Sequence, residues 1–226
     1  MEKHAFNIAI DGPAGAGKST IAKLVAKKLD FIYVDTGAMY RAMALYFLRQ
    51  GIDKTDENAI NATLDKVEIT IRYENGAQQV ILNGENVSGL IRTEEVGNMA
   101  SATSVYKKVR EKLVELQKDL AKKADVIMDG RDIGTCVLPN ADVKVYLTAS
   151  STVRAKRRYY ELKEKGTACD LDEIEKAIIE RDYRDMHRET SPLKQADDAV
   201  LLDSSDMTLK EVVDTIVSMI DKKQGA

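Results

Sequence analysis

A glycine-rich segment near the N-terminus carries the residue types that bind a triphosphate. It matches the pattern G-x-x-x-x-G-K-[ST] and comes directly after an apolar run at residues 6–10. In such a loop the backbone N–H groups point at phosphate oxygens, and the start of the next helix adds positive potential. Lys18 would reach the β- and γ-phosphates, and Ser19 would offer a Mg²⁺ ligand. The residues expected to bind the nucleoside triphosphate are Gly12, Pro13, Ala14, Gly15, Ala16, Gly17, Lys18, Ser19 and Thr20.

A carboxylate follows another apolar run later in the chain. Asp129 comes directly after residues 126–128 and is expected at the carboxyl end of a strand, where open α/β sheets place their ligands. There it could orient Mg²⁺ through water. A strand-end Asp is also a common loop cap, and only the glycine-rich loop favours the functional interpretation.

The apolar runs and the helical patterns between most of them predict a parallel sheet. The runs lie at residues 6–10, 31–34, 126–128, 143–147 and 199–202. Three helical faces are expected to pack inward: Ile21, Leu24, Val25 and Leu29; Val105, Val109, Leu113, Leu116 and Leu120; and Val212, Ile216, Met219 and Ile220. Thr208 and Glu211 have the spacing of a capping box. The predicted core is a P-loop NTPase α/β fold with three layers, α/β/α, around a five-stranded parallel sheet.

Two segments depart from this alternation within one predicted domain, residues 1–226. Apolar residues alternate with polar ones on both sides of Asn75-Gly76, a strong hairpin signal, so residues 63–98 are expected to form an inserted small antiparallel sheet. Residues 151–190 are unusually charged, and about 151–170 are expected to form a mobile helical lid. Arg154, Arg157 and Arg158 share one face there, although such charged faces are ordinarily only solvated.

The composition of the chain excludes several classes of function and site. The net charge is -3, which argues against a binder of nucleic-acid polymers that relies on bulk basicity. Two histidines nearly exclude a His-based triad or a multi-histidine metal site. The two cysteines, Cys136 and Cys169, form no CxxC pair, which fits a reducing cytosol. No apolar span of 18 residues occurs, so a cytoplasmic protein without a membrane partner is expected, with monomer as the default.

Four segments together resemble the bacterial cytidylate kinase family over nearly the whole chain. They are IDGP at residues 10–13, DTGAMYR at 35–41, DGRDIGT at 129–135 and RDYRD at 181–185. The inserted hairpin resembles the extended monophosphate-binding region of that family. Thr36 departs from the Ser of many members but keeps the hydroxyl, so only its fine positioning differs.

The resemblance implies an enzyme that uses Mg²⁺ to transfer the γ-phosphoryl group of ATP to CMP or dCMP. Phosphate-transfer roles fall to Lys18, Arg131, Arg188 and Asp129, and lid contacts to ATP fall to Arg157 and Arg158. The implied CMP-binding residues are Thr36, Tyr40, Arg41, Ser101, Arg110, Arg131, Asp132, Arg181, Asp185 and Arg188.

The chemistry of these side chains suits the implied roles. Guanidinium groups make multidentate contacts with phosphate oxygens. Cytosine presents an N4 donor with N3 and O2 acceptors, which Asp132 and Arg110 could read. Arg181 and Asp185 lie one helical turn apart, a spacing that by itself is typical of surface ion pairs.

Three alternatives stay open on the residues alone. Another small P-loop kinase could act on adenylate, uridylate, shikimate or a sugar acid, although Asp132 with Arg110 fits those acceptors poorly. A GTPase-like switch would carry an Asn-Lys-x-Asp motif, and the sequence has none. A noncatalytic nucleotide-binding module would form no ADP when CMP is added.

Overall fold

The structure, a computed structural model, describes residues 5–74 and 76–225. The chain forms two compact units. The first unit contains Met1–Tyr33 and Ala121–Ala226, and the second contains Val34–Leu120. Each unit has its own buried apolar cluster, so each is described by itself.

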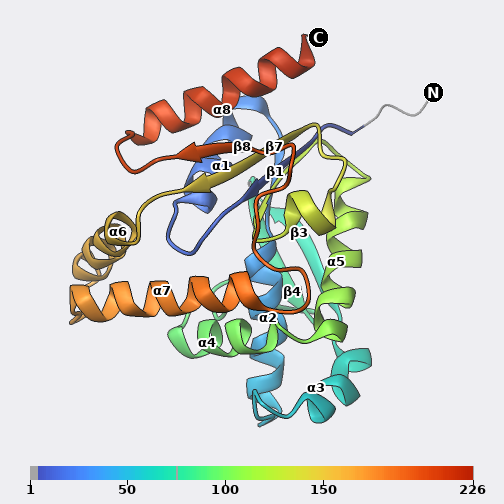
Figure 1. The fold of residues 1–226 in the computed structure, drawn as a ribbon. Coiled ribbons are helices and arrows are strands. Elements are labelled where there is room, and N and C mark those ends of the chain that lie inside the picture. Colours follow the sequence, from blue (N-terminus) through green and yellow to red (C-terminus); the bar gives the residue numbers. More distant parts are fainter. Residues whose placement is uncertain (1–4, 75, 226) are drawn as a thin grey trace. The chain divides into compact units, whose positions relative to one another are not determined.

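Five strands form one sheet, with strand order β2-β6-β1-β7-β8. Its strands β1, β7 and β8 are labelled in Figure 1. β1 pairs in parallel with β6 and β7, and β7 pairs in parallel with β8. The strands are β1 Asn7–Asp11, β2 Ile32–Asp35, β6 Val126–Gly130, β7 Val143–Thr148 and β8 Val200–Asp203. β1 and β6 read as continuous apolar runs because a central parallel strand is covered on both faces. The five predicted strands are confirmed.

Among the described residues, four α-helices belong to the first unit. They are α1 Lys18–Leu29, α6 Ser151–Glu164, α7 Leu171–His187 and α8 Leu209–Gln224. The inward face of α8 is confirmed, and its first turn has the predicted capping box of Thr208 and Glu211. α1 also packs on the sheet, but Leu24 is 39 % exposed, so its predicted place in the core is wrong. α6 and α7 run side by side (Figure 1).

The second unit is built around a small antiparallel sheet, order β3-β4-β5. Its elements are α2 Thr36–Arg49, α3 Glu57–Thr63, a 3-10 turn Leu64–Lys66, β3 Ile69–Glu74, β4 Ala77–Leu82, β5 Glu85–Asn86, α4 Glu94–Thr103 and α5 Lys107–Ala121. β3 and β4 form the predicted hairpin, in which Glu74 pairs with Ala77. Asn75 of the predicted turn lies outside the described residues, whereas Gly76 has the expected positive φ of 73°.

The long helical pattern before residue 121 was predicted to pack on the parallel sheet. Instead, Val109 and Leu113 of α5 are buried in the apolar cluster of the second unit, with α2 and the small sheet. Val105 precedes the helix and is 38 % exposed. A periodic pattern identifies the apolar face of a helix but not the surface that covers it.

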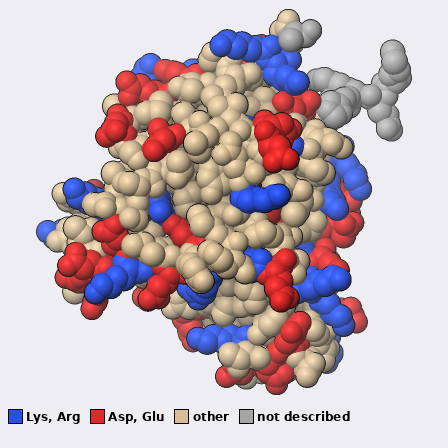
Figure 2. Space-filling model, viewed as in Figure 1, with Lys and Arg blue, Asp and Glu red and all other residues tan. Residues whose placement is uncertain are grey.

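The second unit is wider than the predicted insertion at 63–98, because α2, α3, α4 and α5 belong to it. The organisation as one kinase domain and the mobility of residues 151–170 stay predictions. In Figure 2 acidic and basic side chains are interspersed over the visible face. In the described part of the chain, every helix is too short or too polar to cross a membrane.

Candidate active site

The glycine-rich loop connects β1 directly to α1, as the motif requires. Gly12, Gly15 and Gly17 have φ values of 148°, 75° and 88°, a region that favours glycine. Gly17 is the N-cap of α1, and no side chain caps the helix there. The first N–H groups of a helix lack partners within the helix, so a helix start of this kind suits an anion.

Lys18 is buried, with its Nζ donating to the carbonyl of Pro13 at 2.7 Å. Burial lowers the pKa of Lys18 well below its ordinary value, and the nearby guanidinium groups of Arg131 and Arg181 lower it further. The carboxylates of Asp129 and Asp11 act in the opposite direction and raise it. The start of α1 is therefore surrounded by charges of both signs, and its cations can stabilise an anion that enters.

Asp129 stands at the end of β6, beside the first turn of α1. Its Oδ2 accepts a hydrogen bond from Ser19 Oγ at 2.8 Å, and its Oδ1 accepts one from Tyr33 Oη at 2.8 Å. These contacts bring the two predicted Mg²⁺ residues together. Tyr33 had no predicted role, since a Tyr in a strand is more often a packing residue.

A second group of charges lies in the same unit. Arg131 Nε donates to Asp185 Oδ2 at 2.9 Å. Arg188 lies between two carboxylates, with its nitrogens 3.6 Å from Asp132 Oδ1 and 3.8 Å from Asp185 Oδ1. Arg188, Asp132 and Asp185 are all buried. The spacing of Arg181 and Asp185 is thus not that of a simple surface pair, because Asp185 faces Arg131 and Arg188.

The electrostatics of this cluster favour its ionised form. Burial opposes the charge of Asp185, but Arg131 and Arg181 outweigh burial and hold the pKa of that carboxyl below its ordinary value. Burial likewise opposes the charge of Arg131, and Asp185 outweighs it, so the pKa of Arg131 is raised. The cluster therefore presents fixed charges to a bound anion.

Asp11 holds the loop that carries Arg131 and Asp132. Its two carboxylate oxygens accept the N–H groups of Ile133 at 2.8 Å and Gly134 at 2.7 Å. These donors begin a π-helical turn, Ile133–Val137. Burial raises the pKa of Asp11 to about 6, although both hydrogen bonds lower it.

This pKa predicts a pH dependence of stability. Because the pKa is above its unfolded value, Asp11 stabilises the fold most when protonated, and this contribution is lost as the pH rises through about 6. Between pH 5 and pH 7 the loss should be about 1 kcal/mol. Denaturant unfolding of the wild type and of Asp11→Asn at both pH values measures it. The wild type should lose that much relative to the variant, and equal pH slopes would contradict the assignment.

The three arginines of α6 do not act as one solvated face. Arg154 is buried and pairs with Asp182 of α7 at 2.6 Å, so it does not belong to a solvated face. Arg157 donates to the carbonyl of Ser204 at 2.8 Å. Arg158 is exposed and pairs with Glu161 at 3.0 Å. ATP contacts by Arg157 and Arg158 stay predictions.

In the second unit, α2 begins with a tightly held turn. Asp35 is its N-cap and accepts the N–H of Ala38 at 2.9 Å. The side chain of Gln78, in β4, bonds the backbone of Asp35 twice: its Oε1 accepts the Asp35 N–H at 2.7 Å, and its Nε2 donates to the Asp35 carbonyl at 3.2 Å. Arg92 pairs with the Asp35 carboxylate at 2.6 Å. The start of α2, which carries Thr36, is therefore fixed by the small sheet.

Two of the predicted base-binding residues meet in the second unit. The Arg110 guanidinium lies over the Tyr40 ring, 5.4 Å from its centroid, and Arg110 Nη1 donates to the carbonyl of Ser104 at 3.1 Å. Ser101 lies one turn earlier in α4, and its carbonyl accepts from Ser104 Oγ at 3.1 Å. Arg41 donates to the carbonyl of Ile91 at 3.1 Å.

Sequence reasoning missed several groups that hold this machinery. Asp11, Asp35 and Asp182 stand inside the quoted motifs, but the motifs do not say which backbone groups they bond. Gln78 and Arg92 carry no local signal. Their partners become visible only in the folded chain.

The fold and the site define a P-loop nucleotide-binding protein, because the central strand of a parallel sheet leads through a glycine loop into a helix that begins with Lys18 and Ser19. The second group of charges, in which Arg131 and Arg188 pair with Asp132 and Asp185, lies in the same unit, and its guanidinium groups suit a second anion. The chain belongs to the cytidylate kinase family, whose sequence profile matches residues 8–222. The resemblance drawn from the motifs is thereby confirmed.

Relatives agree over nearly the full length. The chain is 52 % identical over 228 residues to a cytidylate kinase of Lactobacillus johnsonii, covering 99 % of each chain. It is 51 % identical over 220 residues to one of Caldicellulosiruptor saccharolyticus, covering 97 % of each. A solved gluconokinase from Sinorhizobium meliloti 1021 is similar in fold, with a TM-score of 0.50 and 13 % identity over 98 % of this chain and 94 % of that one.

Proposed function

We propose that this protein transfers the γ-phosphoryl group of ATP to CMP or dCMP, giving ADP and CDP or dCDP. The observation that carries the proposal is the buried Lys18 at the start of α1, directly after a glycine loop and near enough to Arg131 for that guanidinium to lower its pKa, in a chain of this family. Phosphoryl transfer spreads negative charge over the oxygens of the moving group. A cationic cluster of this kind stabilises that charge.

On the donor side, the amides of residues 12–20 bind the triphosphate and Lys18 neutralises the oxygens of the transferred group. Gly17 leaves the start of α1 open to the phosphates. Arg157 and Arg158 of α6 contact ATP when the predicted lid, residues 151–170, closes over it. Closure excludes water, the competing acceptor.

On the acceptor side, Arg41, Arg131 and Arg188 bind the monophosphate, and Arg181 and Asp185 bind the ribose. The acceptor is already an anion, so no dedicated base is needed and catalysis rests on in-line positioning and charge. Asp185 keeps Arg131 in place through its 2.9 Å hydrogen bond. Arg131 can then stabilise the transition state without moving.

Ser19 and Asp129 fit Mg²⁺, since a hydroxyl and a carboxylate are hard oxygen donors and this ion takes few protein ligands beside nucleotide phosphates. Ser19 would bind it directly and Asp129 through water. Held there, the ion would supply positive charge that offsets part of the negative charge of the ATP phosphates. Asp129 also keeps Ser19 oriented through the 2.8 Å hydrogen bond.

The pyrimidine is read by Asp132 and Arg110, with help from Thr36, Tyr40 and Ser101. Asp132 accepts from the N4 amino group of cytosine, and Arg110 donates to N3 or O2. Both side chains are buried, and a buried charge discriminates strongly because an unmatched partner leaves it without a hydrogen bond.

Asp132→Ala should lower the preference for CMP over UMP by roughly tenfold, since one charged hydrogen bond to the base is lost. The variant also removes a neighbour of Arg188, so turnover of both substrates falls. The ratio of the two kcat/KM values is therefore the measurement. An unchanged ratio would show that Asp132 does not contact the base.

We also propose that the protein acts as a cytoplasmic monomer on small-molecule substrates, without nucleic-acid or membrane partners. The two free cysteines fit a reducing compartment. Sedimentation of the purified protein tests the monomer.

The activity itself is tested by coupled ADP release with CMP, dCMP, UMP, AMP and GMP as acceptors. Cytidine monophosphates should give the highest kcat/KM. ADP release that no acceptor stimulates, or that AMP stimulates most, would overturn the proposal.

A further inference from the structure

The backbone N–H and the backbone carbonyl of Ala14, in the glycine loop, are each bonded by a buried side chain. Asp182 Oδ1 accepts the Ala14 N–H at 3.0 Å, and Arg154 Nη1 donates to the Ala14 carbonyl at 2.8 Å. The same Arg154 nitrogen donates to Asp182 Oδ2 at 2.6 Å. The backbone of Ala14 and the side chains of Asp182 and Arg154 thus form a closed ring of hydrogen bonds, here called the Ala14 clamp.

The Ala14 clamp is buried, which makes it costly. Arg154 is 6 % exposed and Asp182 is 7 % exposed. Removing an ion pair from water is costly unless further hydrogen bonds satisfy it. Arg154 meets this condition through Nε, which donates to the carbonyl of Ala149 at 2.8 Å. A buried pair is weak evidence for stability by itself, whereas the two bonds to Ala14 show that this pair holds the backbone of the glycine loop.

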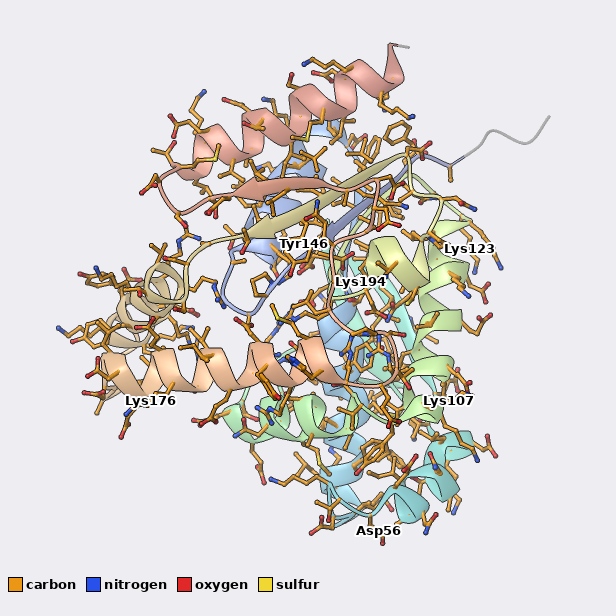
Figure 3. All side chains as sticks on the ribbon, in the orientation of Figure 1. Asp56, Lys107, Lys123, Tyr146, Lys176 and Lys194 are labelled. Carbon is orange, nitrogen blue, oxygen red and sulfur yellow. The ribbon has the colours of Figure 1, made fainter. Side chains whose placement is uncertain are left out.

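α6 lies directly against the loop. A Cβ on Gly15 would lie 3.3 Å from the Cβ of Arg154, and Gly15 has a φ of 75°. Tyr146 projects from β7 nearby (Figure 3), and burial together with the charge of Asp182 raises its pKa. On the side of α6, the glycine loop is therefore packed against Arg154.

α7 carries the clamp and part of the acceptor cluster on one face. Asp182 and Asp185 are three residues apart, which places them on neighbouring turns of the same side. Asp182 holds Ala14, and Asp185 holds Arg131. One rigid helix thus fixes both the loop for the triphosphate and a cation for the acceptor.

We propose that Asp182 and Arg154 are positioning residues that set the conformation of the glycine loop and so couple the lid helices to ATP affinity. This inference rests on the proposed function in that the loop is the ATP site. Neither side chain is proposed to touch the transferred phosphoryl group. The clamp acts by holding the loop ready, which lowers the cost of ordering it when ATP binds.

The test is MgATP affinity by titration calorimetry, with no acceptor present. Asp182→Asn keeps an acceptor for the Ala14 N–H but loses the charge that holds Arg154, and Arg154→Lys keeps the charge but loses the forked contact. Each should weaken MgATP binding roughly tenfold. The double variant should be little weaker than either single one, because both break the same ring.

Glu175→Gln is the matched control, since Glu175 also joins α7 to α6, through Ser151 and Thr152, but does not touch the loop. It should change MgATP affinity less than twofold. Exchange of the Ala14 amide hydrogen should be slow in the wild type and in Glu175→Gln, and fast in Asp182→Asn and Arg154→Lys. A folded Asp182→Asn with wild-type affinity and slow Ala14 exchange would overturn the proposal, as would equal losses in Glu175→Gln.

These measurements distinguish failure of the clamp proposal from failure of the proposed function. If the wild type binds MgATP but no cytidine monophosphate stimulates ADP release, the function is wrong while the clamp is still measured by affinity and exchange. In an active enzyme, the clamp variants should raise the KM for ATP more than the KM for CMP. Equal rises in both KM values would count against a role specific to the loop.

Discussion

Replacing Lys18 with Ala should lower CMP-dependent turnover on the order of a thousandfold. Lys18 Nζ is buried at the start of α1 and held by the Pro13 carbonyl at 2.7 Å, so it is already placed for a phosphate that enters the loop. Charge placed in advance stabilises the transition state without reorganisation. Coupled ADP release at saturating ATP and CMP measures the loss in kcat.

The same variant should stay folded. Burial and the guanidinium groups of Arg131 and Arg181 lower the pKa of Lys18, so the variant removes a charge that burial disfavours, together with the hydrogen bond to the Pro13 carbonyl. These two changes oppose each other, so the free energy of unfolding should change little. Lys27→Ala, an exposed position on the same helix, is the matched control and should keep wild-type turnover. A folded Lys18→Ala enzyme with more than a tenth of wild-type kcat would contradict the role.

Features that depend on neighbours in the chain were predictable from the sequence. The glycine loop, the hairpin of β3 and β4 and the capping box of α8 each depend on residues only a few positions apart. The strands were also predictable, because central parallel strands are apolar on both faces. Local chemistry determines these elements almost alone.

Contacts between distant residues were not predictable. Asp182 bonds the N–H of Ala14, 168 residues away, and no local pattern distinguishes it from Asp185 on the same helix. The periodicity of α5 gave its apolar face correctly from Val109 onward but not at Val105, and the face belongs to the cluster of the second unit. The charge pattern of α6 suggested a solvated face, but Arg154 is buried because a partner exists on α7. A sequence states what a residue can bond, and only the fold supplies the partner.

Replacing Gly12 with Ala should destabilise the first unit severely. Gly12 has a φ of 148°, and a Cβ there would lie 1.9 Å from the carbonyl oxygen of Leu147. Leu147 sits in β7, where it pairs with Leu202 of β8, while the neighbouring Tyr146 pairs with Asp11 of β1. The Leu147 carbonyl therefore cannot retreat without breaking the register of three strands.

Two costs add at this position. An unfavourable φ costs about 1–3 kcal/mol, and overpacking against fixed backbone costs about 1–3 kcal/mol or more. Gly84→Ala separates them, because Gly84 also has a positive φ, 85°, but would place its Cβ where no atom lies within 4 Å. It should cost about 1 kcal/mol.

Denaturant unfolding of both variants tests this argument, with soluble yield as a second measure if Gly12→Ala does not accumulate. Gly12→Ala should lose several kcal/mol more than Gly84→Ala. The excess reflects the contact with the Leu147 carbonyl together with the difference in φ, 148° at Gly12 against 85° at Gly84. Equal losses in the two variants would mean that backbone conformation alone, and not the closeness of β7, requires glycine at the head of the loop.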